Sequence, residues 1–168
     1  MDYTGECRAL AKARKAAFAE APTRPNEVWQ LDFSEYETTS GGIWRLAGVT
    51  AYFTKYEHGW HLAPTCTGTD AVEAVTIAIV EAERLAGRPL AQALADPATG
   101  EIRRIKLVTN NSAAFKGAAF ARFIASRPEL LHTRTRAKSP GQNGVRERAF
   151  GSVKYEHLYW HEIDGAQH

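Results

Sequence analysis

The chain has 168 residues, of which 44% are hydrophobic and 24% are charged, and its formal net charge is +2. This composition predicts one globular domain, and a net charge this small leaves any nucleic-acid site to local clusters of basic residues. The two cysteines, Cys7 and Cys66, form no CxxC pair and so indicate neither a disulfide framework nor a zinc knuckle. The N-terminus lacks a signal-peptide pattern, and the longest apolar run, residues 74–80, is too short to cross a bilayer. We therefore expect a cytoplasmic protein that does not contact a membrane.

The first 22 residues are predicted to form a helical arm or linker. Residues 6–20 are rich in alanine, lysine and arginine, and Pro22 and Pro25 prevent the helix from continuing. The compact domain is expected to span residues 23–168. Because the chain stops at His168 without a terminating motif, we expect it to be a piece of a longer protein.

Three short strands are predicted at the start of the compact domain. Residues 27–36 alternate with period two, which places Asp32 on the face opposite Trp29 and Leu31. Residues 43–54 and 57–63 follow after short turns and are also rich in aromatic and aliphatic residues. Three consecutive strands with tight connections predict an antiparallel meander.

The hydrophobic period then changes to that of a helix. Residues 70–73 fit a capping box, apolar residues recur at helical spacing to Leu85, and Gly87 and Pro89 end the helix. After a long connection over residues 88–101, the predicted elements are a strand over 102–109, a helix over 115–124, a strand over 130–135 and a helix over 145–158. This order predicts an α/β protein with a five-stranded mixed sheet, its first three strands antiparallel, flanked by helices.

Three positions are candidates for a metal site. Asp32 lies on the first strand, Asn110 directly follows the fourth, and Glu147 lies in the first turn of the last helix. If the first and fourth strands are neighbours, Asp32 and Asn110 converge at one edge of the sheet. Carboxylates that converge without histidine or cysteine suit Mg²⁺ or Mn²⁺ rather than zinc. Taken singly, each residue is more often a surface charge or part of a turn.

Three segments together resemble the catalytic core of bacterial insertion-sequence transposases and retroviral-type integrases. They are residues 25–33 (PNEVWQLDF), 107–115 (LVTNNSAAF) and 139–150 (SPGQNGVRERAF). The second is similar to a family motif in which TDNG precedes two variable residues and an aromatic. The spacing of 36 residues between Asn110 and Glu147 is also close to that of these D,D,E enzymes. The resemblance covers about residues 23–160 and implies an RNase H-like fold.

The resemblance implies divalent-metal-dependent cleavage of DNA 3′ ends and DNA strand transfer. Asp32 would bridge two Mg²⁺ or Mn²⁺ ions, and positions 110 and 147 would each help to hold one. The expected partners are transposon ends and target DNA, with a homodimer or a higher assembly. No small-molecule cofactor and no membrane are expected, and the family implies a bacterial, nucleoid-associated protein.

This chain departs from the family pattern at two positions of the second motif. Asn110 stands where the family has aspartate, and Ser112 stands where it has glycine. An amide brings no charge, so we predict weaker metal binding and severely reduced strand transfer. The glycine could supply backbone freedom that Ser112 lacks.

Basic residues surround the third motif, and we expect them to contact DNA phosphates. They are Arg136, Lys138, Arg146, Arg148 and Lys154. Lys154 lies two helical turns after Glu147 and also matches a family position that contacts DNA ends. Two alternative functions remain open, a catalytically silent DNA-binding or assembly module and an RNase H-type nuclease. The third motif disfavours the nuclease.

Overall fold

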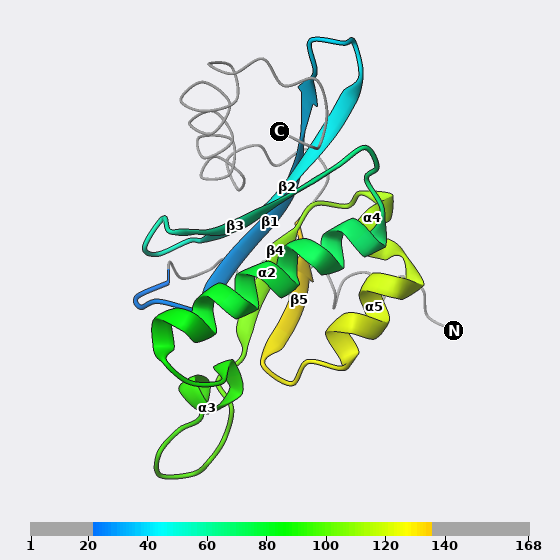
Figure 1. Ribbon diagram of the computed structural model, residues 1–168. Helices are drawn as coiled ribbons and strands as arrows, with labels where there is room; N and C mark the ends of the chain where they lie inside the picture. Colours follow the sequence, from blue (N-terminus) through cyan, green and yellow to red (C-terminus); the bar gives the residue numbers. More distant parts are fainter. Residues whose placement is uncertain (1–21, 136–168) are drawn as a thin grey trace, which may run out of the picture.

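The computed structural model describes residues 22–135 of the chain. The predicted N-terminal arm, the third motif and the last helix therefore lie outside the described residues. The described part contains a five-stranded sheet and four helices (Figure 1).

The sheet has the strand order β3-β2-β1-β4-β5. The strands are β1 (Val28–Glu37), β2 (Ile43–Ala51), β3 (Glu57–Ala63), β4 (Ile105–Thr109) and β5 (Leu130–Arg134). β1, β2 and β3 pair antiparallel, whereas β4 is parallel to both β1 and β5. The predicted mixed sheet with an initial antiparallel meander is confirmed, and β1 and β4 are neighbours.

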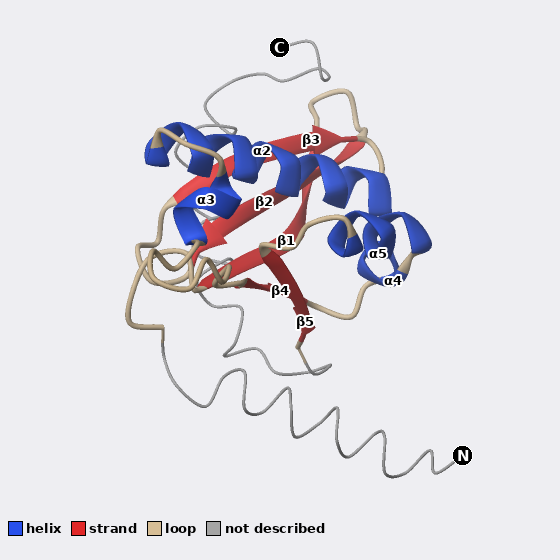
Figure 2. Cartoon of the chain, turned by 90° about the horizontal axis from the view of Figure 1, so that it is seen from below, coloured by secondary structure: helices blue, strands red, loops and turns tan. Residues whose placement is uncertain are grey.

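The described helices cover one face of this sheet (Figures 1 and 2). They are α2 (Gly68–Ala86), α3 (Leu90–Leu94), α4 (Ala113–Lys116) and α5 (Ala118–Ala125). Trp29 and Leu31 point from β1 into the same buried cluster as Ile79 of α2 and Phe120 of α5. The period-two alternation of β1 thus directs its large apolar side chains toward the helices.

α2 begins with a capping box one turn earlier than the sequence indicated. Thr67 is the N-cap residue, its hydroxyl oxygen accepts from the backbone N–H of Asp70, and the Asp70 carboxylate accepts from the backbone N–H of Thr67. The predicted box over Asp70 and Glu73 is therefore wrong, because Asp70 is the third helical residue. The helix ends at Gly87, whose φ of 66° is the left-handed conformation that glycine adopts without strain.

Several predicted boundaries differ from the structure. β2 ends at Ala51 rather than at residue 54, because the chain turns there and Lys55 has a φ of 61°. β4 begins at Ile105, and Ile102 forms only an isolated bridge with Ala95. The helix predicted over residues 115–124 is divided into α4 and α5 by the extended backbone at Gly117.

Replacing Gly59 with alanine is expected to destabilise the fold by about 2–3 kcal/mol. Gly59 has a φ of 150°, and a Cβ atom there would overlap Cγ2 of Ile77 on α2. Urea unfolding measures the change. Gly41→Ala is the matched control, since Gly41 also has a positive φ (87°) but has no atom within 4 Å of the added Cβ.

The overlap with Ile77 of α2 also predicts that substitutions at positions 59 and 77 are energetically coupled. Ile77→Ala removes Cγ2, so the double variant should lose less stability than the two single losses added together. A Gly59→Ala loss no larger than that of Gly41→Ala would show that α2 does not restrict this position.

Candidate active site where β4 ends beside β1

Asp32 and Asn110 meet at one edge of the sheet. In the parallel β1–β4 pair, Gln30 is the register partner of Val108, so positions two residues further along both strands reach the same place. The side-chain Nδ2 of Asn110 donates to Oδ1 of Asp32 at 2.9 Å. Two of the three predicted motif positions are thus in direct contact, 78 residues apart in the sequence.

The hydrogen bonds around Asn110 determine which way its amide points. The backbone N–H of Ser112 donates to Oδ1 of Asn110 at 2.8 Å. Because a backbone N–H can only donate, the amide oxygen must face Ser112 and the NH₂ group must face Asp32. The same Oδ1 of Asp32 also accepts from the backbone N–H of Phe33 at 2.8 Å.

Ser112 does not strain the loop in which it replaces the family glycine. Its φ is −64° and its ψ is 158°, an extended conformation that any residue adopts. The sequence-based concern about backbone freedom at this position is therefore wrong. Its hydroxyl oxygen is buried without a hydrogen-bond partner within the described part of the chain.

A partly buried network of hydrogen bonds fixes the Asn110 backbone. The Thr109 hydroxyl donates to the Asn110 carbonyl oxygen at 3.0 Å and lies 2.8 Å from Nε2 of His132. With its proton directed at the carbonyl, this hydroxyl accepts from His132, so Nε2 of the neutral ring carries the proton. Asn111 donates through Nδ2 to the Thr135 carbonyl oxygen at 2.6 Å, which joins the loop to the end of β5.

His132 remains neutral over most of the pH range. Burial lowers its pKa from the usual 6.5 to about 4, and the positive charge of Arg134 adds to the effect. Its ring packs edge-on against Phe120 at 5.1 Å between centroids. Sequence reasoning missed Thr109 and His132, because their pairing depends on the β4–β5 register.

Cys66 and Asp70 lie near this edge, at the start of α2. Burial raises the pKa of the Cys66 thiol, and the nearby Arg45 only partly opposes this, so the thiol is not activated. Burial alone would raise the pKa of Asp70. Hydrogen bonds from Thr67, Thr65 and His61 outweigh that effect and hold the pKa at about 2. Asp70 is thus a charged helix cap whose acceptors are already used.

The described residues do not fit a two-metal centre as they stand. Asp32 supplies one carboxylate, and the Asn110 oxygen that could ligate a cation already accepts from Ser112. Within residues 22–135, no three His, Cys, Asp or Glu residues are grouped as metal ligands would be. An aspartate at position 110 would instead place two carboxylates about 3 Å apart, an arrangement that a divalent cation stabilises.

The remaining predicted site residues lie outside the described residues. They are Arg136, Lys138, Arg146, Glu147, Arg148 and Lys154. Their roles stay predictions. None of the helices within residues 22–135 is long and apolar enough to span a membrane.

Comparison with known proteins identifies the fold. No family model matches the chain, and no curated protein matches it. A chain of the simian T-cell lymphotropic virus intasome, in complex with PP2A regulatory subunit B56 gamma, matches with a TM-score of 0.61 at 20% identity, over 83% of this chain. The match spans 44% of that intasome chain.

Two structures of the HTLV-2 integrase catalytic core domain in complex with magnesium also match. The dimeric form gives a TM-score of 0.54 over 80% of this chain and 72% of that one, and the trimeric form gives 0.55 over 80% and 71%. Both are 21% identical to this chain. The protein therefore has the RNase H-like fold of integrase catalytic core domains.

Proposed function

We propose that the chain is the catalytic core of a DNA transposase or integrase, a metal-dependent polynucleotidyl transferase, and that Asn110 severely reduces its activity in this sequence. Residues 23–168 would form the core and residues 1–22 an arm. The contact between Asp32 and Asn110 carries the proposal, since it unites the first two motif positions at the edge where an integrase-like fold joins β1 to β4. We place the protein in the bacterial cytoplasm, associated with the nucleoid.

The chemistry of this class explains why position 110 decides the activity. Carboxylates at this edge would hold Mg²⁺ or Mn²⁺, which would supply activation of an attacking hydroxyl and stabilisation of the leaving oxygen of a phosphodiester. Asp32 retains its carboxylate, and Glu147 would supply another. Asn110 brings an NH₂ group to the place where an anionic ligand is needed, so it satisfies Asp32 with a hydrogen bond rather than by sharing a cation with it.

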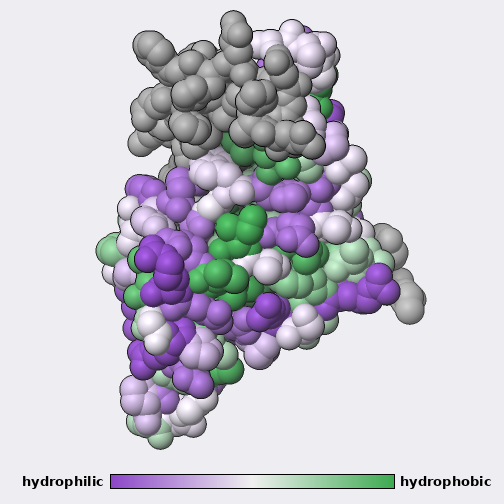
Figure 3. Space-filling model, in the orientation of Figure 1, coloured by the Kyte–Doolittle hydropathy of each residue, from purple (hydrophilic) through white to green (hydrophobic). Residues whose placement is uncertain are grey.

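DNA is the proposed partner, as transposon ends and as target. The basic residues around Glu147 would bind its phosphates. A homodimer or higher assembly is part of the same proposal. Val80 and Leu85 are large apolar side chains exposed on α2, 60% and 54% accessible, and Figure 3 shows apolar surface over the middle of that helix. Such surface favours burial between protein chains.

A second candidate is a catalytically silent DNA-binding or assembly module. The hydrogen bond between Asn110 and Asp32 favours it, because this pair is satisfied without a metal ion. Such a module would keep the fold and bind DNA while transferring no strands.

Strand transfer on a branched DNA discriminates between the two. Because the reaction exchanges one phosphodiester for another, it can be run in reverse on a branched substrate, which requires no recognition of DNA ends. With Mn²⁺, we expect Asn110→Asp to raise the rate by about 100-fold or more, equivalent to a barrier about 2.7 kcal/mol lower. The control combines Asn110→Asp with Asp32→Asn and should lose the gain. Equal, robust activity with Asn110 and with Asn110→Asp would refute the impairment, and inactivity of both would favour the silent module.

A further inference from the structure

A cavity lined by arginines lies at the far end of the sheet from Asp32. Its volume is about 620 Å³, and Arg24, Arg88 and Arg103 contribute to its wall. Leu94 and Ile102 form an apolar part of the same wall. Neither the proposed catalytic edge nor the three sequence motifs include these arginines.

A hydrogen-bonded hairpin forms one side of this cavity. The backbone N–H of Asp96 donates to the Glu101 carbonyl oxygen, and the N–H of Gly100 donates back to the carbonyl oxygen of Asp96, both at 2.8 Å. The Asp96 carboxylate accepts from the N–H groups of Ala98 and Thr99, which lowers its pKa and closes the turn. The N–H of Arg103 donates to the Leu94 carbonyl oxygen, so α3 and the start of β4 are held together.

Two of the three arginines are available to bind a ligand. Arg24 forms an ion pair with Glu27 at 2.8 Å. Within residues 22–135, the side chains of Arg88 and Arg103 form no ion pair or hydrogen bond. Two acids, Asp96 and exposed Glu101, also line the cavity, and the charges of both carboxylates oppose an anion here. Arg104 and Lys106, which follow Arg103 closely in the sequence, are two further basic residues of this segment.

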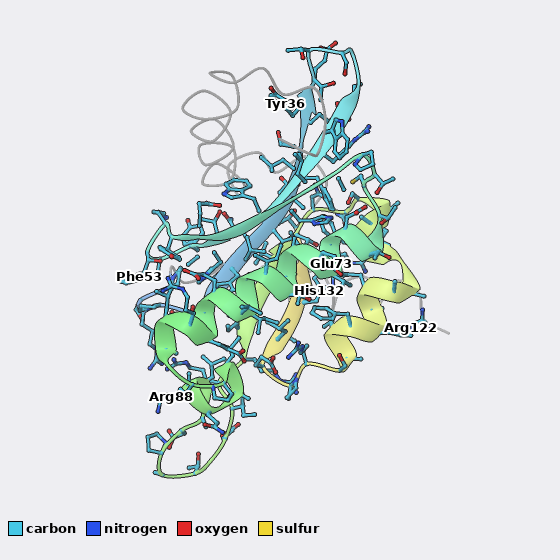
Figure 4. All side chains as sticks on the ribbon, viewed as in Figure 1. Tyr36, Phe53, Glu73, Arg88, Arg122 and His132 are labelled. Carbon is cyan, nitrogen blue, oxygen red and sulfur yellow. The ribbon has the colours of Figure 1, made fainter. Side chains whose placement is uncertain are left out.

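This cavity is remote from Asn110. Arg103 precedes β4 and Asn110 follows it, so at about 3.3 Å per residue the two lie roughly 20 Å apart. Figure 1 shows α3 beside one end of α2 and α4 beside the other, and Figure 4 shows Arg88 at the end that carries α3. A ligand in the cavity therefore cannot be the reacting group itself.

We propose that Arg88 and Arg103 bind backbone phosphates of a DNA duplex, as a second DNA contact outside the catalytic edge. The inference rests on the proposed function for its choice of DNA. Guanidinium groups offer several donors in a planar fork that matches phosphate oxygens, so each of the two free guanidinium groups on this wall would bind a phosphate. A DNA held about 20 Å from Asp32 is fixed in orientation as well as in position.

Equilibrium binding of a fluorescent duplex, without metal and with Asn110 unchanged, tests this contact. Removing one arginine–phosphate pair should lower the slope of log K against log salt by about 0.9, so Arg88→Ala/Arg103→Ala should lower it by nearly two and bind about 50-fold more weakly at 0.1 M salt. Arg122→Ala is the control for each single variant, because Arg122 is exposed on α5, well away from Arg88 (Figure 4). Glu101→Gln should tighten binding, an effect that general damage to the fold would not produce.

The outcomes separate this inference from the proposed function. If the unaltered chain binds DNA and the single variants Arg88→Ala and Arg103→Ala match Arg122→Ala, the second DNA contact is refuted and the proposed function stands. If the unaltered chain does not bind DNA, both fail. A parallel titration with inorganic phosphate tests whether the arginines bind free phosphate instead of DNA. Phosphate binding that the double variant abolishes, with DNA affinity unchanged, would also refute the DNA contact.

Discussion

Asn110→Asp is expected to destabilise the metal-free protein by about 2–4 kcal/mol and to make its stability depend on Mn²⁺. The substitution removes the donor of the 2.9 Å hydrogen bond to Asp32 and puts a second carboxylate in its place. Two unit charges about 4 Å apart near a protein surface repel by about 4 kcal/mol. Protonating one of the two carboxyls at pH 7 costs a similar free energy, so the repulsion cannot destabilise the protein by more than about this amount.

Mn²⁺ should reverse this loss. A cation that binds the folded state alone stabilises it by RT ln(1 + [L]/Kd), about 2.7 kcal/mol at a concentration of 100 Kd. Unfolding by urea with EDTA and with Mn²⁺ measures both effects. Asn110→Ala is the control, because it removes the hydrogen bond without adding charge and should show no dependence on metal. An Asn110→Asp protein as stable as its parent in EDTA, and indifferent to Mn²⁺, would contradict the account of this pair.

Acidification from pH 7 to pH 4.5 is expected to destabilise the fold by about 2 kcal/mol through buried His58 and by up to about 2 kcal/mol through half-buried His132. Burial lowers the pKa of His58 from 6.5 to about 4, although Glu81 partly opposes it, and burial likewise lowers the pKa of His132 to about 4. At pH values between about 4 and 6.5, the histidines of the unfolded chain bind more protons than those of the folded chain. Stability is therefore complete above pH 6.5 and is lost as the pH falls toward 4.

The structure explains why these histidines resist protonation. His58 is 6% exposed, and its ring packs at a tilt of 44° against the Trp29 ring with 4.6 Å between centroids. Neither ring nitrogen has a hydrogen-bond partner among the described residues. Urea unfolding at several pH values measures the loss. His58→Phe keeps an aromatic ring between Trp29 and Tyr56 and should remove about half of the pH dependence. A stability that stays constant between pH 7 and 4.5 would show that neither pKa is depressed.

Much of this fold could be predicted because its elements have clear periods. The alternation in β1 places Trp29 and Leu31 in the core, and the helical spacing of α2 buries Val75 and Ile79. The structure confirms the sheet and the order of its strands in the sequence. The short helix α3 was missed within the connection over residues 88–101, since its five residues are too few to show a helical period.

The candidate site was predictable in position but not in its bonding. β4 ends beside the middle of β1, so the meeting of Asp32 and Asn110 follows once β1 and β4 are parallel neighbours in this register. The direction of the Asn110 amide depends on the Ser112 N–H, and the support from His132 depends on the register of β5. Both are tertiary details that residue types alone do not specify.

The central claim is that Asp32 and position 110 form a metal-ligating edge in which the Asn110 amide replaces a cation. Electron paramagnetic resonance of Mn²⁺, titrated into the protein, counts free ions directly and tests this claim without a DNA substrate. The account predicts that Asn110→Asp binds Mn²⁺ at least about 10-fold more tightly than its parent, a difference of about 1.4 kcal/mol. Adding Asp32→Asn should abolish the gain. Equal Mn²⁺ affinity with Asn110 and with Asn110→Asp, or a gain that survives the loss of the Asp32 carboxylate, would contradict the claim.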